Sequence, residues 1–250
     1  MAKQLGTLLI GGKLDGLSFY MSRYGPIVRK IGTVTKERYK TDPAFERRRR
    51  AADEFGYAGK LTGLIKHGVM RCCPLAVTGT THNRLTSILR KTVLEDTVSE
   101  WGHRRITAEN ARLLEGFNWR DQRTVDSMLH VAYPVVLDTA GGSASLAIDA
   151  LVPEGDVKLD GGATHMELTL ALVAVDWDRK AFYTACDKSA MIALNGKNAV
   201  RIGLSCALDI YSGHILIAGI AVQGYREVKG EMVPLKEVAG FEIGAAGVGG

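Results

Sequence analysis

The hydrophobic pattern of this chain changes its period near residue 124. Before that point, Phe45, Ala52, Phe55, Leu61 and Leu64 recur at helical spacing, which predicts amphipathic helices. After about residue 128, short apolar runs alternate with turn signals, as at 139–142 and 195–197, which predicts antiparallel strands. Because helices and strands occupy separate stretches, we expect an α+β protein. Its expected order is an N-terminal β-ribbon and two or three helices, followed by a C-terminal antiparallel β-sandwich.

Charge changes sign at the same place. Residues 1–124 hold 23 Lys and Arg against 12 Asp and Glu, a net of +11, whereas residues 125–250 hold 9 against 15, a net of −6. The overall net charge of +5 therefore hides a polarised chain. Such a molecule attracts polyanions at one end, or attracts copies of itself end to end.

Turn and cap signals divide the chain into four predicted segments. Residues 1–40 read as a β-ribbon arm, too slight to be stable without docking on something. Residues 41–124 form a basic helical region, with one helix from 41 to just before Pro74, a second over about 81–100 and a short third over 107–114. Residues 125–243 form the β-sandwich, and 244–250 (GAAGVGG) form a flexible Gly-rich tail.

Three glycines interrupt the first predicted helix at helical spacing. Gly56, Gly59 and Gly63 recur at intervals of three and four residues. Glycine weakens a helix by up to about 1 kcal/mol per site relative to alanine. Their repetition therefore indicates a backbone pressed closely against a neighbour.

Several classes of protein are disfavoured by composition. No apolar run reaches the roughly 20 residues that cross a bilayer, and the first residues lack a signal-peptide pattern. We therefore expect a cytoplasmic protein without a membrane partner. The four cysteines, Cys72, Cys73, Cys186 and Cys206, lack Cys-x-x-Cys spacing, so we expect buried, reduced thiols. No cofactor, metal site or catalytic residue is predicted.

Charged clusters offer the remaining functional signals. The arginine run 47–50 follows three further basic residues, and arginine pairs well with phosphate and carboxylate groups. The run is read as a solvated or intersubunit face, with nucleic acid as the alternative. Asp176 and Asp178 flank Trp177, and they are read as solvated charges rather than metal ligands.

Part of the sequence resembles a family of uncharacterised bacterial proteins. The resemblance rests on GKLDGLSFY (12–20), IVRK (27–30) and TDPAFERR (41–48), with a weaker likeness at MVPLK (232–236). It implies a protein of similar length with the same order of ribbon, helices and strand-rich half. The resemblance implies no activity, cofactor or catalytic residue.

These observations favour a non-enzymatic structural protein that self-assembles head to tail into a tube, filament or particle. Heterologous contacts of this kind give rings or open polymers, and a short ribbon is an element that a neighbouring copy can accept. The predicted partners are copies of the same chain. The predicted interface residues are Phe19, Tyr20, Arg47, Arg48, Arg49 and Arg50 on one side, and Asp178, Glu227, Glu231 and Glu237 on the other.

Two alternatives stay open. One is a nucleic-acid-binding protein that uses the basic helical half, through Lys36, Arg38, Lys40, Arg47, Arg48, Arg49 and Arg50. The other is an enzyme or ligand binder whose site is formed only by the fold, and which no motif in the sequence marks.

Overall fold

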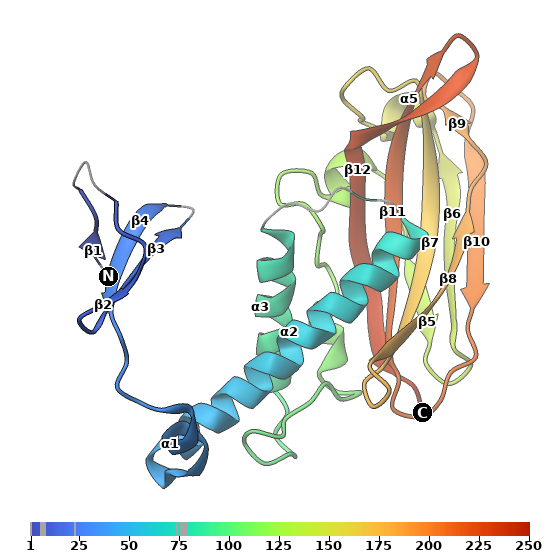
Figure 1. Cartoon of the computed structure of the whole chain (residues 1–250). Helices are drawn as coiled ribbons and strands as arrows, with labels where there is room; N and C mark the ends of the chain where they lie inside the picture. The colour runs from blue at the N-terminus through green and yellow to red at the C-terminus, as the bar shows by residue number, and fades with distance from the viewer. Residues whose placement is uncertain (1, 6–8, 23, 74, 76–79) are drawn as a thin grey trace. The chain divides into compact units, whose positions relative to one another are not determined.

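The structure is a computed structural model that describes the chain except for residues 1, 6–8, 23, 74 and 76–79. It confirms the α+β class: an N-terminal four-stranded antiparallel sheet, helices, and C-terminal antiparallel sheets that include a curled half-barrel (Figure 1). The chain divides into two compact units, residues 1–49 and 50–250.

The first unit contains a small antiparallel sheet with strand order β1-β4-β3-β2. At the β2–β3 turn, Asp15 and Gly16 both have positive φ, as two-residue hairpin turns require. A short helix and a 3-10 turn follow, joined by Asp42, whose side chain accepts a hydrogen bond from the backbone N–H of Ala44. The elements are β1 (Ala2–Lys3), β2 (Gly12–Leu14), β3 (Leu17–Ser22), β4 (Gly25–Lys30), α1 (Lys36–Thr41) and η1 (Pro43–Phe45).

The helix α2 (Glu46–Cys72) begins in the first unit and continues into the second, where it packs with α3 (Thr81–Leu94). Its buried side chains, including Tyr57, Leu61, Ile65 and Val69, recur every three or four residues and form one face. The remaining helical elements are short: η2 (Ala111–Leu114), α4 (Val125–Met128) and α5 (Pro153–Asp156).

Two antiparallel sheets complete the second unit. One has the order β12-β11-β7-β8, with β9 paired to β7, and the other has the order β10-β6-β5. The strands are β5 (Val135–Asp138), β6 (Ser143–Leu151), β7 (His165–Asp176), β8 (Ala181–Lys188), β9 (Ile192–Ala193), β10 (Val200–Ala207), β11 (Ile215–Val228) and β12 (Glu231–Val248).

The larger sheet is the middle layer of the second unit, as Figure 1 shows. Along β7, Ala171 and Val173 belong to the hydrophobic cluster formed with α2 and α3, whereas Leu170 and Leu172 belong to the cluster formed with the smaller sheet. Both faces of β7 are covered, and the strand is continuously apolar from Leu170 to Val175 rather than alternating. The helices and one face of the larger sheet therefore share one core, and the two sheets share a second core on the other face.

That shared core changes the predicted division of the chain. The pattern change near residue 124 is a change of secondary structure inside the unit 50–250 and not a boundary between units. The helix α1 also lies in the stretch assigned to the ribbon arm. The first long helix ends at Cys72, as expected, and Pro74 itself lies outside the described residues.

Other predicted elements differ at their ends. The helix predicted over 81–100 stops at Leu94, and the one predicted over 107–114 is a single 3-10 turn. The stretch 244–250 is not a flexible tail through most of its length, because β12 continues to Val248, which pairs with Ile215 of β11. Pairing with β11 satisfies the backbone hydrogen bonds of this glycine-rich stretch.

The glycines of α2 differ from the expectation of close packing. A Cβ atom added at Gly56, Gly59 or Gly63 would meet no neighbouring atom within 4 Å. At Gly68, by contrast, a Cβ atom would lie 2.5 Å from Cγ1 of Val173. Close approach of the helix to the sheet therefore depends on Gly68. The prediction that Gly56, Gly59 and Gly63 pack closely against another part of the same chain is wrong.

Candidate functional site

The sheet of the first unit has two chemically different faces. Residues directly opposite each other on antiparallel strands share a face, and successive residues alternate between faces. Leu14 pairs with Leu17, Phe19 pairs with Val28 and Met21 with Pro26. One side of the sheet, here named the apolar face, therefore carries Leu14, Leu17, Phe19, Met21, Pro26 and Val28, with Lys30 at one end.

The other side, here named the basic face, has the opposite character. It carries Lys3, Lys13, Ser18, Tyr20, Ile27 and Arg29. The Arg29 guanidinium lies 5.5 Å from the centre of the Tyr20 ring, which is a cation–π distance. Phe19 and Tyr20, predicted together as interface residues, thus lie on opposite faces of one strand.

No described residue of the first unit is buried. On the apolar face, the Leu14 side chain is 61% exposed and Met21 is 67% exposed. A sheet with one hydrophobic face is stable when another layer covers that face. The apolar face thus exposes large hydrophobic side chains.

The arginine run at the start of α2 serves partly to hold local structure. The Arg49 guanidinium donates hydrogen bonds to the carbonyl oxygens of Tyr39 (2.6 Å) and Asp42 (3.0 Å). The Arg48 guanidinium lies 5.6 Å from the centre of the Phe45 ring. Arg49 therefore provides a hydrogen bond to the Tyr39 carbonyl in the last turn of α1, and adds one to the Asp42 carbonyl, which also accepts the Phe45 N–H.

The remaining predicted basic residues are distributed over two segments. Lys36, Arg38 and Lys40 lie on α1, and Arg38 forms an ion pair with Asp42. Arg47 is exposed, whereas the half-buried Arg50 donates a hydrogen bond to the carbonyl oxygen of Trp101, at 3.3 Å. The four consecutive arginines point to different surroundings, as their helical spacing requires.

The four predicted acidic counterparts do not form one surface. Glu227 and Glu231 lie at the β11–β12 hairpin tip, and Glu237 lies further along β12. Asp178 lies in the turn between β7 and β8, at the end of the sheet opposite to that hairpin tip. A single contact can therefore engage the hairpin glutamates or Asp178, but not all four.

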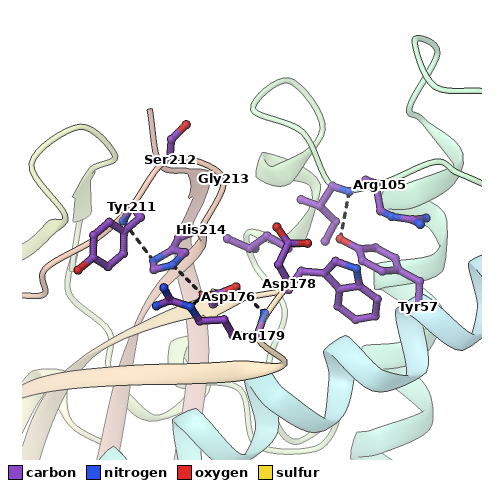
Figure 2. Close-up of a pocket in the computed structure, with 12 residues that line it drawn as sticks. Tyr57, Arg105, Asp176, Asp178, Arg179, Tyr211, Ser212, Gly213 and His214 are labelled. Carbon is purple, nitrogen blue, oxygen red and sulfur yellow. Dashed lines mark hydrogen bonds and ion pairs between the residues drawn. The ribbon is translucent and has the colours of Figure 1, made fainter.

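A polar cavity of about 550 Å³ lies at the Asp178 end of the second unit (Figure 2). Four segments line it: α2 through Tyr57, the loop at Arg105, the β7–β8 turn at 176–179 and the loop at 211–215. Among its lining residues, Asp178 was predicted as a self-association contact, and none was predicted as catalytic. The fold assembles the cavity from positions far apart in the sequence.

The chemical centre of this cavity is a pair formed by Asp176 and His214. Nε2 of His214 lies 3.6 Å from Oδ2 of Asp176, while Nδ1 accepts the backbone N–H of Tyr211 at 3.4 Å. The backbone N–H of Arg179 donates to Oδ1 of Asp176 at 2.9 Å, and this bond lowers the pKa of Asp176. Asp176 is buried, so its interpretation as a solvated charge is wrong, whereas Asp178 is exposed.

This geometry suits a structural role. Both nitrogens of the His214 ring face protein partners, and general-base catalysis needs a nitrogen directed at the substrate. The pair instead joins the β7–β8 turn to the loop that precedes β11. Among the residues that the structure describes, no group of three or more His, Cys, Asp or Glu side chains is placed to hold a metal ion.

Two buried carboxylates organise the loop that carries Arg105. Glu54 of α2 accepts two hydrogen bonds from the Arg104 guanidinium, at 2.7 and 2.8 Å, and one from the Gly102 backbone N–H. Asp96 accepts backbone N–H groups of the same loop, including that of Arg105 at 2.9 Å. Burial raises the pKa of Asp96, but these hydrogen bonds outweigh it and lower the pKa to about 2.

The cysteines are free thiols that differ in exposure. Cys72 and Cys73 are buried, as expected. Cys186 is exposed and Cys206 is half-buried, so the expectation of four buried thiols is wrong for these two. Both lie on edge strands, β8 and β10, where apolar sequence surroundings do not guarantee burial.

Comparison with protein-family models, with curated proteins and with solved structures gives no match to this chain. In the described part of the chain, no helix combines the length and hydrophobicity required for a membrane span. Proposals about function therefore depend on the geometry above.

Proposed function

We propose that this protein is a non-enzymatic structural subunit that self-associates, and that its N-terminal unit forms a principal contact between copies. The observation that carries the proposal is a four-stranded sheet in which one face is apolar except for Lys30 at one end, and in which none of the described residues is buried. Burying apolar surface contributes about 25 cal/mol per Å². Covering this face therefore gives a strong driving force for association.

The proposed occupant of the apolar face is the same face of a second copy. Two sheets that pack face to face form a sandwich with a shared core, which a single sheet lacks. Such a contact is two-fold and uses identical surfaces on both partners. It places the basic faces outward, where their lysines and arginines stay solvated.

Charge supports a second contact that extends the assembly. Residues 1–49 hold 11 Lys and Arg against 4 Asp and Glu, a net of +7, whereas residues 50–250 hold 21 against 23, a net of −2. The basic residues of α1 and of the arginine run 47–50 on one copy and the acidic strand-rich part of another are complementary. This heterologous contact, combined with the two-fold contact, allows growth into a tube, filament or particle.

The proposal is tested by light scattering coupled to size-exclusion chromatography of nuclease-treated protein. Phe19→Glu and Met21→Glu place a charge on the apolar face, so these variants are expected to form smaller species than the wild type. Ser18→Glu is the matched control, because it adds the same charge to the same strand on the basic face. Far-UV circular dichroism checks that all three variants keep their strands.

Two outcomes contradict self-association. If the wild-type protein is a monodisperse monomer at high concentration, copies of the chain do not associate. Large species that disappear after nuclease treatment, with binding that weakens steeply as salt increases, indicate instead that the basic residues bind nucleic acid. Equal loss of assembly in Ser18→Glu and Phe19→Glu would show that the apolar face is not the contact between copies.

A further inference from the structure

Two cysteines from distant parts of the sequence lie against each other in the second unit. Cys72 is the last residue of α2, and its sulfur lies 3.6 Å from the carbonyl oxygen of Ala185, the residue before Cys186. Burial, first, and the nearby Cys186 thiol, second, raise the pKa of Cys72. Both thiols are free in this structure.

The sheet register explains why these two cysteines meet. Cys186 of β8 pairs with Ala171 of β7, and Ala171 belongs to the hydrophobic cluster formed with the helices. Cys186 therefore lies on the helix side of the sheet, where α2 ends. Cys206, on β10, packs against the other cluster, between the two sheets.

The two thiols differ in access to solvent. Cys186 is exposed, whereas Cys72 is 5% exposed and burial raises its pKa to about 12. Thiolates are the reactive form in disulfide exchange. Cys186 is thus the thiol that a small molecule reaches first, and Cys72 is the buried neighbour that can respond.

We propose that Cys72 and Cys186 form a redox-sensitive pair that a small-molecule disulfide converts into a disulfide bond between the end of α2 and β8. In the first step, the Cys186 thiolate attacks one sulfur of the small disulfide and releases one small thiol. In the second step, Cys72 attacks the Cys186 sulfur of the mixed disulfide. The second small thiol leaves and takes up the Cys72 proton, so two protein thiols are oxidised and one disulfide is reduced.

The bond would fasten α2 to the sheet where the described helix ends. It closes a long loop, from 72 to 186, and a cross-link of this kind restricts the unfolded chain. The oxidised protein is therefore expected to unfold at a higher temperature than the reduced protein. This inference is independent of self-association, because both cysteines lie in the second unit.

The test uses the full chain treated with oxidised glutathione, followed by intact mass measurement and peptide mapping without reduction. The wild type is expected to lose the mass of two hydrogens and to yield a Cys72–Cys186 peptide, and Cys206→Ser is expected to do the same. Cys72→Ser is expected to stop at a stable glutathione adduct on Cys186. Cys186→Ser is expected to take up no glutathione.

Each other outcome overturns the inference. Wild-type protein that keeps glutathione on Cys186, or stays fully reduced, lacks a responding thiol. A link from Cys186 to Cys206 identifies a different pair. Uptake of glutathione by natively folded Cys186→Ser, with folding checked by thermal melting, shows that another thiol reacts first.

Discussion

Replacing the open glycines of α2 by alanine is expected to stabilise the protein. Gly56, Gly59 and Gly63 lie inside a 27-residue helix, and an added Cβ atom at each meets nothing within 4 Å. Glycine in a helix interior costs about 0.5–1 kcal/mol relative to alanine. No steric cost opposes this gain, so each substitution is expected to add most of it to the free energy of unfolding.

The three substitutions together are expected to add roughly 2 kcal/mol to the free energy of unfolding. Their effects are expected to sum because the three sites share no contacts. For a chain of this size, 1 kcal/mol shifts the melting temperature by about 2–4 °C. The triple variant is therefore expected to melt about 4–8 °C above the wild type. Urea unfolding followed by circular dichroism measures the free energy directly, with an unchanged slope against denaturant.

Gly68→Ala is the matched control on the same helix. Its Cβ atom would lie 2.5 Å from Cγ1 of Val173, so the helix or the Val173 side chain must shift in a packed core. Overpacking of this kind costs about 1–3 kcal/mol, which exceeds the helical gain, and the variant is expected to be less stable than the wild type. A triple variant no more stable than the wild type, or a stabilised Gly68→Ala, would refute the reasoning.

Three further predictions concern buried or half-buried carboxylates. Glu54→Ala leaves the Arg104 guanidinium without its partner and is expected to cost about 3 kcal/mol in urea unfolding, whereas an unchanged midpoint would contradict this. Asp96 has a pKa lowered to about 2, so its contribution is present above pH 4 and is lost as pH falls toward 2. Asp96→Asn is therefore expected to cost roughly 2 kcal/mol at pH 7 and to flatten the loss between pH 4 and 2. Burial raises the pKa of Glu242, so its ionisation destabilises the folded protein as pH rises above about 4.5; Glu242→Gln is expected to weaken that decline, and an identical pH profile would argue against it.

Features with a local cause could be predicted from the sequence. Asp42 and Pro43 mark the entry to the long helix, and apolar spacing marks its buried face, so α2 was placed closely. The alternation of Leu17, Phe19 and Met21 contains the signal for the apolar face of the first sheet. Only the pairing register shows that Tyr20 points the other way.

Features with a long-range cause could not be predicted. The glycine-rich end of the chain has weak strand propensity, and it is a strand because β11 pairs with it through Val248. His214 meets Asp176 because the β7–β8 turn and the loop before β11 lie at the same end of the sheet. Cys72 meets Cys186 for a similar reason, and no spacing in the sequence records either contact.

The central claim is that the apolar face of the N-terminal sheet joins one copy of the chain to another. Sedimentation velocity of nuclease-treated protein over a wide concentration range tests it most directly, with Phe19→Glu and Ser18→Glu run in parallel. We predict that the wild type and Ser18→Glu sediment as oligomers whose size increases with concentration, while Phe19→Glu sediments more slowly. A wild-type protein that sediments as a monomer at every concentration would contradict the account.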